Sequence, residues 1–195
     1  MKYIGLLAVI VILVACSESE RNNGDISNED DTINEISVDY RSLGDSLTMN
    51  AQSTLLGFVS SQIGSNGFEG AVSYCNVHAA GITDSLSNLH GVKISRVTDK
   101  VRNKNNSATE QERAILDFFR SNPNTKDTLM EADGQKTYYK KIGIGMPTCL
   151  KCHGNEETDI DKKALSVINE KYPDDEARNY KMGDLRGAWK VVFEN

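Results

Sequence analysis

The segment Cys149-Leu150-Lys151-Cys152-His153 constrains this chain more than any other stretch. Two thiols three positions apart on a helical turn can each add to one vinyl group of a haem, and a histidine directly after them then lies under the iron. The motif therefore predicts covalently attached haem c, with Cys149 and Cys152 as attachment points and His153 as the proximal iron ligand. We interpret the rest of the chain as the scaffold that holds this group.

Three other interpretations of the C-x-x-C pair are weaker than haem attachment. They are a redox pair, half of a zinc site and a chance match. A redox pair of the thioredoxin type is expected near a βαβ pattern, which this sequence does not show. A zinc site needs two more ligands at a similarly short spacing, and the sequence has no second pair of this kind. A chance match is disfavoured because the N-terminus indicates export to the compartment where haem is attached.

The N-terminus resembles a bacterial lipoprotein signal. Lys2 supplies a positive charge, residues 4–14 form an apolar run too short to span a bilayer, and Leu13-Val14-Ala15-Cys16 closes the segment. The resemblance implies removal of residues 1–15 and lipid on the sulfur of Cys16, which anchors a protein to a membrane. A plain secretory signal is the alternative. We expect a lipid-anchored protein of the bacterial cell envelope that faces the periplasm, with the outer membrane or the cell surface as alternative sites.

Residues 16–39 are predicted to form a flexible acidic tether. Positions 17–39 carry eight acidic side chains, one basic side chain and no aromatic residue, so they cannot bury a core. This stretch contributes −7 and Lys2 contributes +1 to the net charge of −6, so residues 40–195 sum to zero. That balance gives no footprint for nucleic acid, which we exclude as a partner. Residues 40–195 are long enough for one haem-binding domain.

Apolar periodicity predicts two helices at the start of this domain. Residues 43–63 repeat an apolar side chain every fourth position, which is typical of an amphipathic helix, and the glycines of 64–67 break it. A second helix is expected over 68–90. It places Cys75 on its buried stripe, and Gly91 suits a left-handed cap at its end.

The second half of the domain is predicted to consist mostly of strands, at 92–97, 128–132, 135–142 and 185–193. Asp133-Gly134 is typical of a tight hairpin turn between the second and third strands. A capping box of Ser107 and Glu110 is expected to open a short helix through Phe119, and another helix is expected over 160–169. This pattern indicates an α+β domain in which an antiparallel sheet packs on N-terminal helices.

The residues alone do not identify the second axial ligand of the iron. Cys75 is favoured, because lipid and haem account for the other three cysteines and an unpaired thiol is unusual in an exported protein. An inert buried thiol is the alternative interpretation. The other candidates are two histidines at the edge or end of the second helix and two methionines outside it, namely His78, His90, Met146 and Met182.

Four groups of residues, in order along the chain, resemble a known family. They are Ala71-Val72-Ser73-Tyr74-Cys75, Gly91-Val92-Lys93-Ile94 with Arg96-Val97-Thr98-Asp99-Lys100-Val101-Arg102-Asn103, Cys149-Leu150-Lys151-Cys152-His153-Gly154, and Tyr172-Pro173 with Gly183-Asp184-Leu185-Arg186-Gly187. From about Leu43 to Phe193 the chain is similar to the Tll0287-like family, which comprises bacterial and cyanobacterial c-type haem domains with a PAS-like fold.

The resemblance implies haem held at Cys149 and Cys152, His153 as the proximal ligand, and Cys75 as an uncommon thiolate ligand on the distal side. Lys104 departs from the family pattern, because proline is expected there, directly after Arg-Asn.

Arg96, Lys100 and Arg102 become candidate partners of the haem propionates, since cationic side chains suit paired carboxylates; solvated surface charges are the alternative. We expect a lipoprotein without enzymatic activity that acts in redox or gas sensing, or in low-potential electron transfer, with a redox protein or a small gas as its partner. The alternatives are a haem enzyme of the peroxidase or nitrite-reductase type, an electron-transfer cytochrome c with a Met or His distal ligand, and a structural lipoprotein.

Overall fold

The computed structural model of the chain describes residues 38–193. The predicted signal over 1–15, the predicted lipid site Cys16 and all but the last two positions of the predicted tether lie outside the described residues. Within the described part, no helix is long and apolar enough to cross a membrane.

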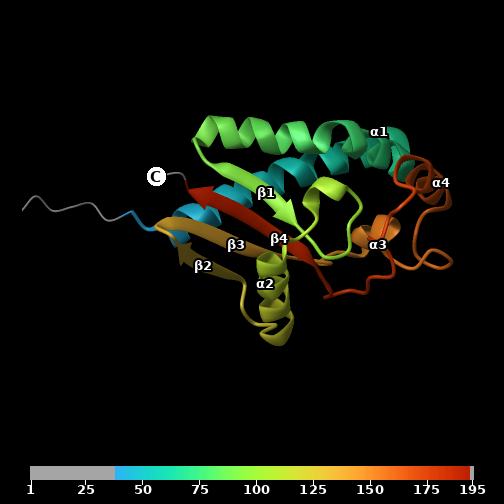
Figure 1. The fold of residues 1–195 in the computed structure, drawn as a ribbon. Helices are drawn as coiled ribbons and strands as arrows, with labels where there is room; N and C mark the ends of the chain where they lie inside the picture. Colours follow the sequence, from blue (N-terminus) through green and yellow to red (C-terminus); the bar gives the residue numbers. More distant parts are fainter. Residues whose placement is uncertain (1–37, 194–195) are drawn as a thin grey trace, which may run out of the picture. The chain divides into compact units, whose positions relative to one another are not determined.

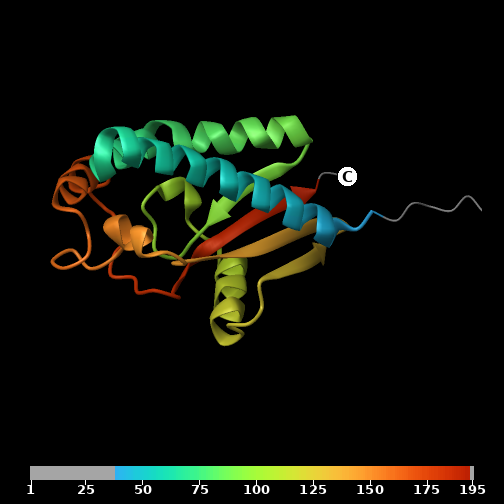
Figure 2. The same ribbon diagram turned by 180° about the vertical axis from the view of Figure 1, so that it is seen from behind.

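Helix α1 (Tyr40–His90) consists of two arms joined at Gly67, whose φ of 70° and ψ of −175° are not helical. The arms lie side by side and run in opposite directions (Figure 1, Figure 2). Glycine adopts such a positive φ without the steric penalty that a Cβ atom brings. The predicted pair of helices, with a break within 64–67, is confirmed.

Both ends of α1 are capped. The carboxylate of Asp39 accepts hydrogen bonds from the N–H groups of Arg41 and Ser42, so Asp39, predicted as the last tether residue, is the N-cap of the domain's first helix. Gly91 ends the helix with a φ of 63° and donates its N–H to Ser87 O, which confirms the predicted left-handed cap.

The strands form one antiparallel sheet in the order β1-β4-β3-β2. They are β1 (Lys93–Val97), β2 (Asp127–Ala132), β3 (Gln135–Gly143) and β4 (Leu185–Phe193). Asp133 and Gly134 join β2 to β3 with φ values of 52° and 76°, the positive values that a tight hairpin turn requires. The predicted strands, the hairpin and the α+β class with an antiparallel sheet are confirmed.

Helices cover both faces of the sheet, because successive side chains along a strand point to opposite sides. Tyr138 of β3 packs with Leu47 of α1. Its neighbour Tyr139 packs on the other face with Leu116 and Phe119 of α2 (Glu110–Ser121). Figure 1 shows α2 on the opposite side of the sheet from α1. The cavity described below lies on the α1 face.

Helix α2 opens at a different capping box from the one predicted at Ser107 and Glu110. Thr109 is the N-cap: its hydroxyl accepts from the Glu112 N–H, and the Glu112 carboxylate accepts from the Thr109 N–H. Ser107 is not available as a cap because it forms an isolated bridge with Thr98 and stays extended. The sequence-based position of the cap was therefore wrong by two residues.

Lys104, where proline was expected, is the first residue of the short 3₁₀ helix η1 (Lys104–Asn106). Asn103 before it has an extended backbone, with φ −99° and ψ 120°. Residues that precede proline adopt this conformation, so the loop keeps a backbone that a proline would also accept. The Lys104 ammonium instead binds the carboxylate of Asp174 at 2.6 Å.

Two further helices complete the domain, α3 (Pro147–His153) and α4 (Lys162–Lys171). The predicted helix over 160–169 is confirmed, with its start at Lys162 because the Asp161 carboxylate caps it. Apolar residues of α4, among them Ala164 and Ile168, pack against Val72 in the second arm of α1.

The close contact between α1 and β3 generates a prediction. A Cβ atom on Gly44 would overlap the ring of Tyr138, with Cδ1 at 2.6 Å, whereas one on Gly81 would meet nothing within 4 Å. Gly44→Ala should lower the free energy of unfolding by about 1–3 kcal/mol, because an overpacked contact forces neighbouring atoms to shift. Gly81→Ala should raise it by up to about 1 kcal/mol, because alanine favours the helix. Urea denaturation measures both values, and equal effects would contradict this packing.

Candidate functional site

A cavity of about 800 Å³ lies between α1, the sheet and α3. Leu55 from the first arm of α1 and Val72 from the second arm line one side, and Ile142 and Trp189 line the sheet side. Ligand and cofactor pockets have volumes of roughly 300–1,000 Å³ and mostly apolar walls. The size and the lining of this cavity therefore suit a large apolar ligand.

Helix α3 presents the whole predicted attachment motif to this cavity. Cys149, Cys152 and His153 all line it, because positions i, i+3 and i+4 share one face of a helix. Pro147 stands at the start of the helix, where its missing N–H is not needed. The sequence prediction that these three side chains act together is consistent with their placement.

The ring of His153 is held in one orientation. Its Nδ1 lies 2.9 Å from Ala177 O, and since a carbonyl oxygen only accepts, Nδ1 carries the proton and Nε2 keeps its lone pair. Tyr180 packs edge-on against the ring, with the centroids 6.2 Å apart. Burial lowers the pKa of His153 well below its usual value, and the charges of Arg102 and Arg186 lower it further. The side chain is thus a neutral imidazole with a free Nε2, the form that binds metals.

The three cysteines of the described part are free thiols that line the cavity. Burial raises the pKa of Cys152 to about 11. Burial also raises the pKa of Cys75, although the charges of Arg96 and Arg102 oppose this effect. Redox cysteines of the thioredoxin type have a lowered pKa, so this environment disfavours that alternative. Within residues 38–193, no three His, Cys, Asp or Glu side chains are grouped so that they could hold a metal ion.

Two of the five candidates for a second axial ligand line the cavity, Cys75 and Met146. Met146 is the N-cap of α3 and so belongs to the same wall as His153. Cys75 belongs to the second arm of α1 and faces the cavity from a different element. The remaining candidates are exposed side chains that do not line the cavity, namely His78, His90 and Met182.

Two arginines that line the cavity, Arg96 and Arg186, have no carboxylate within ion-pair distance in the part of the chain that the structure describes. Arg96 lies over the ring of Trp189, 5.6 Å from its centroid. Arg186 donates to Thr98 Oγ1 at 2.9 Å and to Lys100 O at 3.2 Å. Burial lowers the pKa of both guanidinium groups. The cavity therefore carries two positive charges that an anionic ligand would neutralise.

The other two predicted cations are engaged elsewhere. Arg102 lines the cavity, but its Nε and Nη2 atoms each donate to the carboxylate of Asp175 at 3.0 Å. Lys100 does not line the cavity: its ammonium donates to Arg178 O at 2.6 Å and lies 4.4 Å from the centroid of the Tyr180 ring. The loop before β4 thus takes up the charge of Lys100, whose role as a propionate partner stays a prediction.

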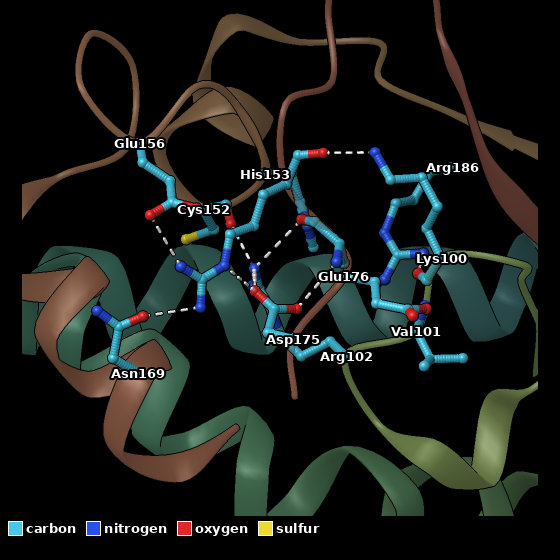
Figure 3. Close-up of polar contacts among 12 residues, drawn as sticks. Lys100, Val101, Arg102, Cys152, His153, Glu156, Asn169, Asp175, Glu176 and Arg186 are labelled. Carbon is cyan, nitrogen blue, oxygen red and sulfur yellow. Dashed lines mark hydrogen bonds and ion pairs between the residues drawn. The ribbon is translucent and has the colours of Figure 1, made fainter. Parts of the chain in front are cut away.

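Asp175, which no sequence pattern singled out, lies at the centre of a network of polar contacts (Figure 3). Its carboxylate is fully buried and pairs with Arg102 and Arg178. Burial by itself raises the pKa of Asp175, but hydrogen bonds and charges from these arginines, with a bond from Ala177 N, lower it overall. No sequence signal distinguishes Asp175 from the other acids of its polar loop. The sequence analysis also did not predict Arg186 as a site residue. The one indication in the sequence was that Arg186 lies in the last segment that resembles the family.

Comparisons with known proteins agree with this geometry. A model of the Tll0287-like family, described as Tll0287, matches residues 17–193. The chain belongs to the Tll0287-like family. Among solved structures, the cyanobacterial heme-protein Tll0287 is similar, with 22% sequence identity and a TM-score of 0.63 over 81% of this chain and 98% of that chain. This likeness confirms the α+β fold with its four-stranded antiparallel sheet. No curated protein matches the chain.

Proposed function

We propose that this chain binds haem c covalently, through thioether bonds at Cys149 and Cys152, with His153 as an axial ligand of the iron. The observation that carries the proposal is the state of His153: its Nδ1 is fixed by Ala177 O at 2.9 Å, and its ring lines the same cavity as both thiols. The relative Tll0287 is a heme-protein, which supports the same class of ligand here.

The described residues fit this group. A bound haem supplies an iron centre that exchanges one electron and takes axial ligands. The side chains of Leu55, Val72 and Ile142 offer apolar walls that exclude water. Helix α3 orients the two thiols and the imidazole on one face, and the bond to Ala177 O keeps the free Nε2 available as a ligand.

Covalent attachment is tested by haem staining on a denaturing gel, after expression with the cytochrome c maturation machinery. Cys149→Ala combined with Cys152→Ala should abolish the stain, because only thioether bonds hold haem in a denatured chain. Cys75→Ala is the matched control, since it removes a thiol from the same cavity and should leave the stain intact. Stain that persists in the double variant would refute the attachment.

Cys75 is the second axial ligand in this proposal. It lines the cavity from the second arm of α1, whereas His153 lies on α3. A thiolate binds ferric iron better than ferrous iron, so Cys75 would stabilise the ferric state and lower the reduction potential. Burial raises the pKa of the free thiol, and coordination to iron is what would keep it deprotonated.

Cys75→Ala should raise the reduction potential and remove the thiolate-to-iron charge-transfer bands of the ferric absorption spectrum. The ferric variant should also bind NO faster than the ferric parent, because Cys75 no longer has to leave the iron first. Met146→Leu is the control for the remaining methionine candidate and should change neither the potential nor the bands. If only Met146→Leu changes them, Met146 is the ligand and Cys75 is an inert buried thiol.

Arg96 and Arg186 are the partners of the two propionates in this proposal. They are the cavity cations without a carboxylate within ion-pair distance among residues 38–193, and guanidinium groups suit carboxylates. Arg186 takes the place that was predicted for Lys100, and Arg102 is already paired with Asp175.

Arg186→Gln should lower the reduction potential, because a buried positive charge near the iron is lost. The potential should also become dependent on pH between about 5 and 8, since a carboxyl group that loses its cation has a raised pKa. Arg120→Gln is the control, because Arg120 pairs with Asp99 and Asp117 and does not line the cavity. Identical potential–pH curves for Arg186→Gln and the parent would remove Arg186 from the site.

Redox or gas sensing, or low-potential electron transfer, suits this cavity better than catalysis. Peroxidase or nitrite-reductase chemistry needs an acid or base beside an open position on the iron. Among the described residues that line the cavity, none is Asp or Glu and the one histidine is His153. Because a thiolate binds ferrous iron weakly, reduction would release Cys75 and admit a small gas such as CO or NO. The redox state would then control access of the gas.

Anchoring to the membrane through lipid on Cys16 is part of the same proposal and rests on the sequence of the N-terminus. Cys16→Ser should move the protein from the membrane fraction to the soluble fraction without changing its absorption spectrum. Fractionation of cells followed by haem staining measures this. Retention of the variant in the membrane would contradict the lipid anchor.

A further inference from the structure

We infer that the ion pair of Arg102 and Asp175 positions the imidazole of His153 and sets the reduction potential of the iron that His153 binds. This inference rests on the proposed function, because it concerns the ligand side of the haem. The two residues act on His153 through Ala177, so both are positioning residues.

The carboxylate of Asp175 fixes the loop that holds His153. Its Oδ1 accepts from Arg102 Nε and from Ala177 N, both at 3.0 Å, and its Oδ2 accepts from Arg102 Nη2 at 3.0 Å and from Arg178 Nε at 2.8 Å. Two parallel bonds to one guanidinium fix its plane as well as its distance. The backbone at Ala177 therefore cannot move independently of Arg102.

Arg102 extends the network to both partners of the histidine contact. Its Nη2 donates to Cys152 O at 2.7 Å, on the helix that carries His153, and reaches Ala177 O at 3.3 Å. Nη2 has two hydrogens and three acceptors, so Ala177 O accepts from His153 Nδ1 and shares one guanidinium N–H, at the longest of the three distances, with another acceptor. Figure 3 shows Arg102 and Asp175 beside His153 at the end of α3.

The shared carbonyl has an electronic consequence. A carbonyl oxygen that also accepts from a guanidinium is a weaker acceptor for the histidine N–H. The imidazole is then less electron-rich and a weaker donor to ferric iron. The positive charge of Arg102 acts in the same direction, because it disfavours the more positive oxidation state of a nearby iron. Arg102 should raise the potential, and the negative charge of Asp175 should lower it.

Shifts of the reduction potential in opposite directions, in variants of Arg102 and of Asp175, distinguish this electronic role from a purely structural one. Loosening of the loop would move the histidine in either variant and shift both potentials in the same direction. In the haem-loaded protein, Arg102→Gln should lower the potential and Asp175→Asn should raise it. Each shift should change the ferric-to-ferrous ratio at a fixed ambient potential about tenfold, which is 59 mV for a one-electron couple. Arg102→Lys keeps the charge and should restore most of the parent's potential.

Lys104→Gln is the matched control. Lys104 joins the same two loops through Asp174 at 2.6 Å, but the two side chains are 76% and 68% exposed, so solvent screens the lost charge. Its potential should equal that of the parent.

Redox titration measures the four variants, and circular dichroism checks that each is folded. Shifts of the same sign in Arg102→Gln and Asp175→Asn, or no shift in either, would overturn the inference. If Arg102→Gln does not fold, the other two variants decide. A higher reduction potential in Asp175→Asn together with an unchanged potential in Arg102→Lys supports the inference, and any other combination of these two potentials overturns it. A parent protein without a haem stain would overturn the proposed function itself, which is a separate observation from the potentials.

Discussion

The site depends on the partners of the last carbonyl groups of α3. A helix of seven residues leaves most of its backbone acceptors without an internal partner, and it is too short to be stable alone. Here the carbonyl oxygens of residues 151–154 accept, in order, from Asp161 N at 3.1 Å, Arg102 Nη2 at 2.7 Å, Tyr180 N at 3.0 Å and Asn179 N at 2.8 Å. Segments distant in the sequence thus fix the direction in which the motif points. The C-x-x-C-H pattern supplies the reactive groups, and the fold supplies their orientation.

The reversal of the chain at Gly67 is the second constraint on the cavity. With a helical backbone at this position, α1 would continue as one rod and carry Cys75 away from the sheet. The positive φ of Gly67 brings the second arm back along the first. Leu55 and Cys75, which are twenty positions apart in one helix, therefore line one cavity. The distance between the motif and Cys75 in the sequence gives no measure of their separation in the fold.

Local signals were sufficient for most of the fold and for part of the site. The apolar periodicity, the glycines near 64–67 and the turn at Asp133-Gly134 act within a few residues, so each could be recognised without knowledge of the packing. Ser107 was mistaken for a cap because its bridge to Thr98 forms only when the loop folds back. Lys100 and Arg186 could not be ranked from the sequence, because the loop before β4 decides which cation faces the cavity. Asp175 stands out only through burial, which a polar loop does not reveal.

The cavity contains two kinds of arginine that differ in what neutralises them. Arg102 is balanced by the buried carboxylate of Asp175, so it belongs to the scaffold before any ligand arrives. Arg96 and Arg186 are half-buried and have no carboxylate within ion-pair distance among residues 38–193, and a half-buried cation without a counter-ion opposes folding. An anionic ligand that pairs with both guanidinium groups would remove this penalty as it binds. Part of the ligand's binding free energy would then appear as stability of the fold. In the proposed function, the same two charges that would select a dianionic ligand would also make the stability of the domain depend on that ligand.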